Sequence, residues 1–168
     1  DGLLRISRVG RRVFTPTRVD LDTVVTRAIE GLAPEIEETK ASIHREALLV
    51  AVGDAVELEQ VVTNLLSNAL KFRSAAPPAV HIRRAPAAKG RVAFSITDNG
   101  IGMEPAHHAM AFRSFHRLDP SRTEGDGLGL AISSRVIARH NGTITVESEL
   151  GKGACFTVEL DAWPTPPD

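Results

Sequence analysis

The segment from Glu57 to Phe72 places the strongest constraint on how this chain can fold. Its apolar residues recur at the three- and four-residue spacing of one helix face, which predicts a long amphipathic helix packed on a sheet. A second stripe on this helix is polar and consists of Gln60, Asn64, Asn68 and Lys71. Exposed helix positions favour Glu, Lys and Arg over Asn. Two asparagines one turn apart therefore indicate ligand binding, with a solvated polar face as the alternative.

Strand patterns lie on both sides of this helix. They cover residues 41–54 (one or two short strands), 79–85, 91–97, 143–149 and 154–160. Two further helices are predicted, over residues 20–40 with a bend at Pro34 and over residues 129–140 with a cap at Asn141-Gly142. Residues 104–127 are expected to form a long loop that contains a little helix. Because strand pairs are mixed with helices, the pattern predicts an α+β two-layer sandwich.

The composition excludes several classes of protein. A chain of 168 residues with 42% hydrophobic content suits one domain. No apolar run approaches the ~18 residues of a membrane span, and the first residues lack the pattern of a signal peptide. A net charge of −1 gives no sign of attraction to nucleic acid or membranes. The single cysteine, Cys155, excludes an intramolecular disulfide and is expected to be a buried, inert thiol. The cytoplasm is the expected compartment.

The sequence DNGIG, residues 98–102, follows a predicted strand and has two interpretations. Asn-Gly is a strong hairpin signal, because both residues tolerate positive φ. The same residues could instead form the floor of a nucleotide pocket.

Three glycines alternate where the helix over residues 129–140 begins: Gly125, Gly127 and Gly129. Closely spaced glycines let backbone N–H groups approach an anion, and a helix N-terminus adds partial positive charge. A merely flexible loop is the alternative. The spacing does not match the dinucleotide-binding fingerprint, since Leu130 stands where a glycine is needed, and it lacks the Gly-Lys-Ser/Thr of a P-loop.

Five motifs follow one another in the sequence, and together they resemble a known family. They are NLLSNALKF (64–72), DNGIG (98–102), AFRSFHRLD (111–119), GDGLGLAI (125–132) and GKGACF (151–156). From about Val19 to Leu160 the chain resembles the catalytic ATP-binding domain of bacterial sensor histidine kinases, a superfamily shared with gyrase, Hsp90 and MutL. The KFRS at the end of the first motif (71–74) also resembles phytochrome-like kinases. The resemblance implies the Bergerat fold: a mixed, mainly antiparallel sheet of about five strands on three helices, with a flexible ATP lid.

The resemblance also implies which residues bind Mg-ATP. Asp98 would accept a hydrogen bond from the adenine amino group, and Gly100 and Gly102 would let the chain turn close to the base. Asn68 would hold Mg²⁺, supported by Asn64 one turn earlier.

The same resemblance assigns the phosphate side of the site and the lid. Lys71 and Arg117 would face the phosphates and, with Asn64, form the catalytic set. The other expected nucleotide contacts are Phe115, His116, Gly125, Gly127, Leu128 and Gly129. Phe112 and Phe115 would anchor the lid, with core packing as the alternative. His107 and His108 are expected to be solvated, and Gly151 and Gly153 to shape a hairpin turn and nothing else.

Kinases of this family phosphorylate a histidine in a His-Glu/Asp-x-x-x-x-Pro type of motif on a dimerisation helix. None of the six histidines lies in such a motif, and His44, which comes nearest, lies in a strand pattern. The acceptor is therefore expected outside this chain, which looks like a fragment unable to autophosphorylate alone. Residues 1–17 would be the end of the dimerisation helix and a linker, 18–162 the catalytic domain and 163–168 a tail. The expected partners are the dimerisation domain and a response regulator receiver domain, within a homodimeric full-length protein.

Two positions bear on the branch of the family. In the ATPase relatives a glutamate at the place of Asn64 activates water, and an amide cannot act as a general base, so slow hydrolysis is expected. Asp126 stands where threonine is common, which leaves ATP affinity open. The alternatives to a histidine kinase are a degenerate pseudokinase scaffold and an anti-sigma-type serine kinase.

Overall fold

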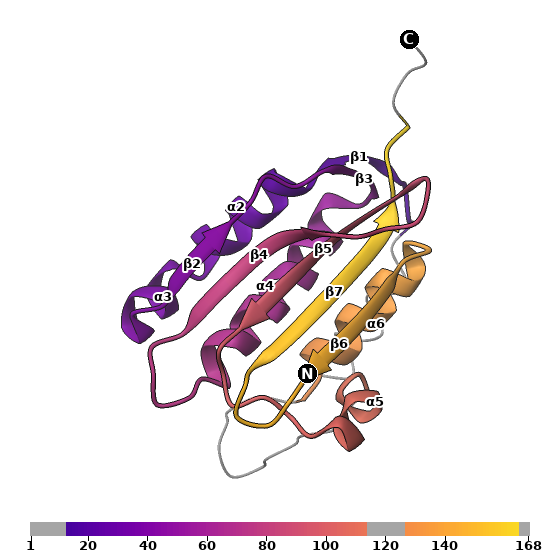
Figure 1. The fold of residues 1–168 in the computed structure, drawn as a ribbon. Helices are drawn as coiled ribbons and strands as arrows, with labels where there is room; N and C mark the ends of the chain where they lie inside the picture. The colour runs from indigo at the N-terminus through magenta and orange to yellow at the C-terminus, as the bar shows by residue number, and fades with distance from the viewer. Residues whose placement is uncertain (1–12, 114–126, 165–168) are drawn as a thin grey trace.

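The computed structural model describes residues 13–113 and 127–164, which form a sheet layer and a helix layer (Figure 1). The sheet has the strand order β2 (Ser42–Arg45), β4 (Ala79–Ala85), β5 (Arg91–Asp98), β7 (Ala154–Asp161) and β6 (Thr143–Ser148). The β2–β4 pair is parallel and the other three pairs are antiparallel. The predicted α+β sandwich with a mixed, mainly antiparallel five-stranded sheet is confirmed.

Three longer helices cover one face of this sheet (Figure 1). They are α2 (Leu21–Gly31), α4 (Ala55–Lys71) and α6 (Gly129–Arg139). Asp20 caps α2, and the Asp54 carboxylate caps α4 by accepting bonds from the N–H groups of Val56 and Glu57 at 2.9 and 3.0 Å. The break expected at Pro34 is present, because a separate helix, α3 (Ala33–Thr39), begins there. The expected short helix in residues 104–127 is present as η1 (Pro105–His107) and α5 (His108–Ala111).

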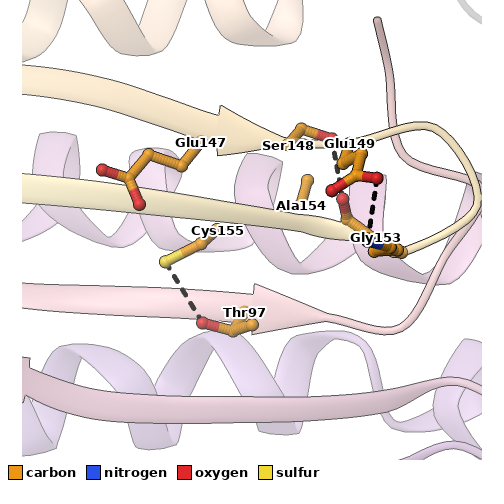
Figure 2. A pocket seen from close by; sticks show the side chains of 8 residues that line it. Thr97, Glu147, Ser148, Glu149, Gly153, Ala154 and Cys155 are labelled. Atoms are coloured by element: carbon orange, nitrogen blue, oxygen red, sulfur yellow. Dashed lines mark hydrogen bonds and ion pairs between the residues drawn. The ribbon is translucent and has the colours of Figure 1, made fainter. Parts of the chain in front are cut away.

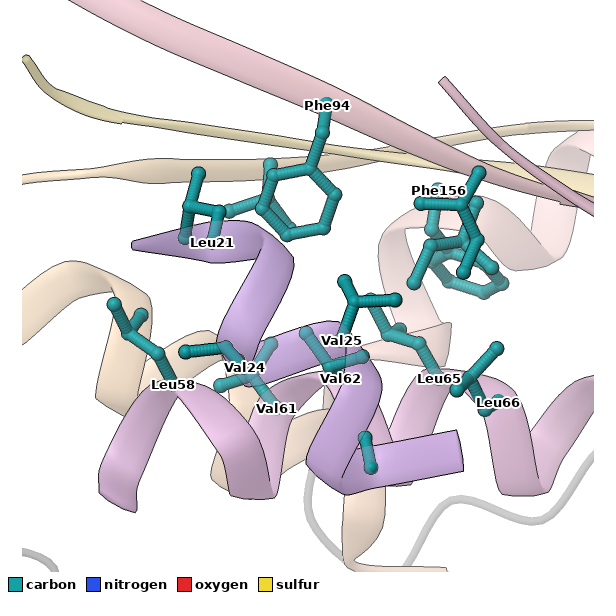
Figure 3. Close-up of a cluster of buried hydrophobic side chains, with 14 of the residues drawn as sticks. Leu21, Val24, Val25, Leu58, Val61, Val62, Leu65, Leu66, Phe94 and Phe156 are labelled. Atoms are coloured by element: carbon teal, nitrogen blue, oxygen red, sulfur yellow. The ribbon is translucent and has the colours of Figure 1, made fainter. Parts of the chain in front are cut away.

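The hydrophobic core lies between the sheet and the three helices (Figure 3). Phe94 of β5 and Phe156 of β7 point from the sheet toward the apolar side chains of α2 and α4. Val61, Val62 and Leu65 of α4 are each 1% exposed. The apolar face predicted from the periodicity of this helix is therefore the face that packs on the sheet.

A second, two-stranded sheet was not expected from the sequence. It pairs β1 (Thr17–Asp20) antiparallel with β3 (Val50–Gly53). The segment before α2 is short and polar except for Val19, so it has no alternating pattern that would predict a strand. The proposed domain boundary between residues 17 and 18 falls inside β1.

Strand alternation turns Cys155 away from the core. Its neighbours Ala154 and Phe156 are buried against the helices, so Cys155 faces the helix-free side of the sheet and is only half-buried. Its Sγ accepts a hydrogen bond from the Thr97 hydroxyl at 3.2 Å. The expectation of a buried thiol was wrong because the apolar run ACFTVEL does not reveal which face each residue takes.

Candidate functional site

Asp98 is the last residue of β5, next to the start of β7, and two backbone N–H groups hold its carboxylate. Oδ1 accepts hydrogen bonds from Gly100 at 2.8 Å and from Ala154 at 3.3 Å. No residue that the structure describes hydrogen-bonds to the second oxygen. Burial raises the pKa of Asp98 above its ordinary value, and the two backbone hydrogen bonds oppose that rise. The side chain is thus an oriented acceptor with one oxygen available to a ligand.

The loop after Asp98 is not a hairpin turn, because β5 pairs with β4 and β7 and no strand follows directly. Asn99 holds this loop to the segment before β4: its Oδ1 accepts from Ala79 N–H at 2.8 Å and its Nδ2 donates to the Pro77 carbonyl at 3.1 Å. This geometry excludes the hairpin interpretation of DNGIG and leaves the nucleotide-pocket interpretation as a prediction.

Gly100 and Gly102 are required by close backbone approach. A Cβ at Gly100 would collide with the carbonyl oxygen of Phe72 at the end of α4, and one at Gly102 would collide with that of Glu149. Gly102 also has a φ of +65°. Ile101 N–H donates to the Phe72 carbonyl at 2.9 Å, so the loop is joined to the C-terminal end of α4.

The asparagine motif on α4 lies beside the start of α6. Asn64 donates its side-chain N–H to the Gly129 carbonyl at 3.1 Å and to the buried Ser133 hydroxyl at 3.3 Å. Asn68, one turn later, is half-buried, and its side chain has no hydrogen bond to a described residue. Lys71 is exposed at the end of the helix. The predicted metal-site and phosphate-site residues therefore share one side of α4.

The glycine-rich motif is described from Gly127 onward. Gly127 has a φ of +68°, and a Cβ at Gly129 would lie 3.7 Å from Cγ of Asn64, which is ordinary contact. The Leu128 side chain is 1% exposed and belongs to the hydrophobic core. The turn thus places glycine backbone, rather than side chains, at the N-terminus of α6.

Several predicted contacts lie outside the described residues: Phe115, His116, Arg117 and Gly125, together with Asp126. Phe112, near the start of the AFRSFHRLD motif, packs edge-on against Phe156 with ring centroids 6.2 Å apart. Core packing, one of its two interpretations, is thus what the structure gives for Phe112. His107 and His108 are half-buried rather than solvated, and His108 Nε2 lies 3.0 Å from the Ser148 carbonyl oxygen.

The third glycine motif does more than shape a hairpin. Gly153 has a φ of +82°, and a Cβ there would collide with the Asp98 carbonyl oxygen. Gly151 N–H donates to the Ile101 carbonyl at 2.7 Å. The expectation that these glycines serve the turn alone was wrong, because the contact partner is distant in sequence and nothing in GKG indicates it.

A shallow hollow of about 360 Å³ lies on the helix-free side, beside the β6–β7 turn (Figure 2). It is lined by Thr97, Cys155 and Glu147, which pair across three strands, and by residues of the turn. None of the lining residues is among the predicted nucleotide contacts. The hollow therefore contains no predicted nucleotide contact, although two of its lining residues, Gly153 and Ala154, also touch Asp98.

The residues present fit a magnesium ion that is held mainly by other ligands. The described residues contain no group of three or more His, Cys, Asp or Glu side chains that could hold a metal. Asn68 offers one hard amide oxygen, and Mg²⁺ commonly uses few protein ligands together with substrate phosphates and water.

Among the helices that the structure describes, none is long and apolar enough to cross a membrane.

Comparison with known proteins shows which family and which relatives this chain is similar to. Residues 53–164 match the family described as "Histidine kinase-, DNA gyrase B-, and HSP90-like ATPase". The chain is 37% identical to cyanobacterial phytochrome A of Nostoc sp. over 93% of its own length and 20% of that protein. It is 35% identical to the sensor-like histidine kinase SenX3 of Mycobacterium tuberculosis over 95% of its length and 40% of that protein.

The full-length ShkA crystal structure superposes with a TM-score of 0.82 at 31% identity, covering 99% of this chain and 36% of that one. The mycobacterial sensor histidine kinase MprB gives a TM-score of 0.76 at 26% identity, over 90% of this chain and all of that one. The chain thus spans less than half the length of each of the two curated relatives. It belongs to the histidine kinase-, DNA gyrase B- and HSP90-like ATPase family and has the Bergerat fold of histidine kinase ATP-binding domains.

Proposed function

We propose that this chain binds Mg-ATP and donates its γ-phosphoryl group to a histidine on a separate dimerisation domain. The observation that carries the proposal is the Asp98 carboxylate, held by two backbone N–H groups with one oxygen left for a ligand. ShkA, whose sequence is 31% identical, was crystallised in complex with AMPPNP, which supports an adenine nucleotide as the ligand.

Each part of the ligand has a matching chemical group. An oriented carboxylate accepts a hydrogen bond from the adenine amine, and it repels the carbonyl that guanine has at the same place. Asn68 would hold Mg²⁺, with Asn64 supporting it one turn earlier, and the ion when bound offsets the negative charge of the phosphates. Lys71 would lie on the phosphate side, and Arg117, outside the described residues, is proposed to act with it during transfer. The glycine backbone at the start of α6 supplies N–H donors for phosphate oxygens.

The chemistry at position 64 favours transfer to a protein over hydrolysis. The N–H group of Asn64 donates to Gly129 and Ser133, and a neutral amide does not take a proton from water near pH 7. Asn64 therefore cannot serve as the general base that would activate water. A phosphoryl group that is not lost to water remains available to a histidine acceptor.

The partners follow from this reaction. The donor needs a dimerisation domain that carries the acceptor histidine, and a response regulator receiver domain that takes the phosphoryl group afterwards. We propose that the full-length protein is a homodimer and that the part of it described by this chain lies in the cytoplasm. The curated relative named as a sensor-like histidine kinase supports the two partner domains.

The test combines the chain with a separately purified dimerisation domain and [γ-³²P]ATP. We expect no label on the chain alone and an acid-labile, base-stable label on the added domain, as phosphohistidine gives. An acid-stable label would support a serine kinase instead. Absence of both labelling and nucleotide binding would support a pseudokinase and contradict the proposal.

A further inference from the structure

The turn between β6 and β7, residues 149–153, closes over the loop that carries Asp98. The contacts are made by backbone: Ala154 N–H donates to the Asp98 carboxylate at 3.3 Å, and Gly151 N–H donates to the Ile101 carbonyl at 2.7 Å. Gly153 lies so close to the Asp98 carbonyl that a Cβ would not fit. Two segments about fifty residues apart in the sequence therefore form one unit around Asp98.

One side chain, Ser148 at the end of β6, bridges these segments, and Figure 2 shows the side of the bridge near Gly153. Its hydroxyl accepts a hydrogen bond from Met103 N–H at 2.9 Å and donates to the Gly153 carbonyl at 2.7 Å. Its own carbonyl oxygen lies 3.0 Å from Nε2 of His108, in α5. Ser148 is half-buried, so these bonds form in a partly desolvated environment, where they are stronger than at an exposed site.

We propose that Ser148 is a positioning residue of the nucleotide site, which fixes the direction of the Asp98 carboxylate and thereby selects adenine over guanine. The proposal rests on the proposed function, in which the Asp98 carboxylate accepts a hydrogen bond from the adenine amine. Guanine carries a carbonyl where adenine carries that amine, so a fixed carboxylate repels it. When the β6–β7 turn loosens, the Ala154 donor moves, and the carboxylate can turn away from the repulsive carbonyl.

Loss of the Ser148 hydroxyl therefore has a distinctive effect on base selectivity. Ser148→Ala removes both hydrogen bonds of the bridge. We expect ATP affinity to fall by about 3- to 10-fold, as the loss of one or two neutral hydrogen bonds implies. GTP affinity should stay the same or rise, because no favourable contact to guanine is lost. The ratio of the GTP to the ATP dissociation constant should fall by at least the same factor.

The experiment is a calorimetric titration of the whole 168-residue chain with ATP and with GTP. Thr145→Ala is the matched control, because Thr145 lies on the same strand, is exposed, and has no side-chain hydrogen bond to a described residue. We expect the control to keep the parental ratio. Ser148→Thr keeps the hydroxyl and should restore most of the selectivity.

A purely structural role for Ser148 would lower the melting temperature and weaken ATP and GTP binding equally, and that result overturns the proposal. A parental ratio in a folded Ser148→Ala variant overturns it as well. If that variant does not fold, Ser148→Cys, with its weak donor, takes its place under the same criterion.

Asp98→Asn, titrated in parallel, separates this proposal from the function on which it rests. If Asp98→Asn binds ATP as the parent does, the proposed function fails. If Asp98→Asn loses ATP while Ser148→Ala keeps the parental ratio, only the role of Ser148 fails.

Discussion

Asn64 of α4 donates its side-chain N–H to the carbonyl of Gly129, 3.1 Å away at the first residue of α6. This bond joins two motifs that are 65 residues apart in the sequence. Because the amide N–H₂ also donates to Ser133, its orientation is determined, and the amide oxygen is left for another ligand. The asparagine motif thus has a structural role in addition to the one proposed for it in metal binding.

The first prediction concerns this bond. Asn64→Asp replaces the donor with a carboxylate that faces the Gly129 carbonyl, so the interaction becomes repulsive. The free energy of unfolding, measured with urea, should fall by about 1–3 kcal/mol. Gln60→Glu makes the same change of charge on the same stripe, and Gln60 has no side-chain hydrogen bond to a described residue. The control should change stability by less than about 0.5 kcal/mol. Equal effects at the two positions would show that the bond contributes nothing.

A second prediction concerns the ion pair between α4 and α6. Arg139 donates to Oε1 of Glu57 at 3.1 Å, and the side chains are 19% and 10% exposed. Oε2 of Glu57 is buried without a hydrogen bond, because His140 Nδ1, 4.0 Å away, lies 2.8 Å from the Val136 carbonyl. Arg139→Met leaves this carboxylate without its cation, which should cost about 2–4 kcal/mol of stability.

A double-mutant cycle isolates that interaction. Adding Glu57→Gln to Arg139→Met removes the uncompensated charge, so the double variant should be more stable than Arg139→Met alone. The measurement is urea unfolding of all four proteins. Strictly additive effects would mean that the two side chains do not interact.

The third prediction is a pH dependence at Asp98. Burial raises the pKa of its carboxyl above the ordinary 3.8, so the folded state binds more protons than the unfolded state between 3.8 and the raised value. Stability therefore falls as the pH rises through that window, and the penalty persists at neutral pH. Asp98→Asn should be more stable than the parent at pH 7, with the gain shrinking as the pH approaches 3.8. Thermal unfolding at several pH values measures this, and a gain independent of pH would contradict it.

Asp161 should behave in the opposite way. A hydrogen bond from Asn141, followed by the contacts with Arg91, lowers the pKa of Asp161 below 3.8 despite slight desolvation. Its contribution to stability is present above pH 3.8 and is lost as the pH falls through the lowered value. Asp161→Asn should therefore be less stable than the parent at pH 7, by less than about 1 kcal/mol, because the side chain is 41% exposed. A stabilised Asp161→Asn at pH 7 would refute this assignment.

Much of the fold could be predicted because it depends on local periodicity. The apolar spacing of α4 and the alternation in β4, β5 and β7 are properties of short segments, and the structure has these elements where they were expected. The strand β1 has no such pattern. It is a strand because β3 is there to pair with it, which is a tertiary reason.

The same distinction between local and tertiary causes applies to the residues of the candidate site. Asp98, Asn64 and Gly102 could be singled out because residue type and motif order indicate them. Ser148 and the contact of Gly153 with Asp98 could not, because Met103, which donates to Ser148, and Asp98 both lie far away in the sequence. A serine at the end of a strand looks like any other polar strand residue, so only the three-dimensional contact identifies it.

The most direct test of the central claim is a calorimetric titration of Asp98→Asn with ATP. Since Oδ1 is held by Gly100 and Ala154, the amide N–H₂ of the new side chain must take the place of the ligand-facing oxygen and oppose the adenine amine. The account predicts ATP binding weakened by about 10- to 150-fold, which is the loss of one charge-assisted hydrogen bond. A folded Asp98→Asn variant that binds ATP with the parental affinity would contradict it.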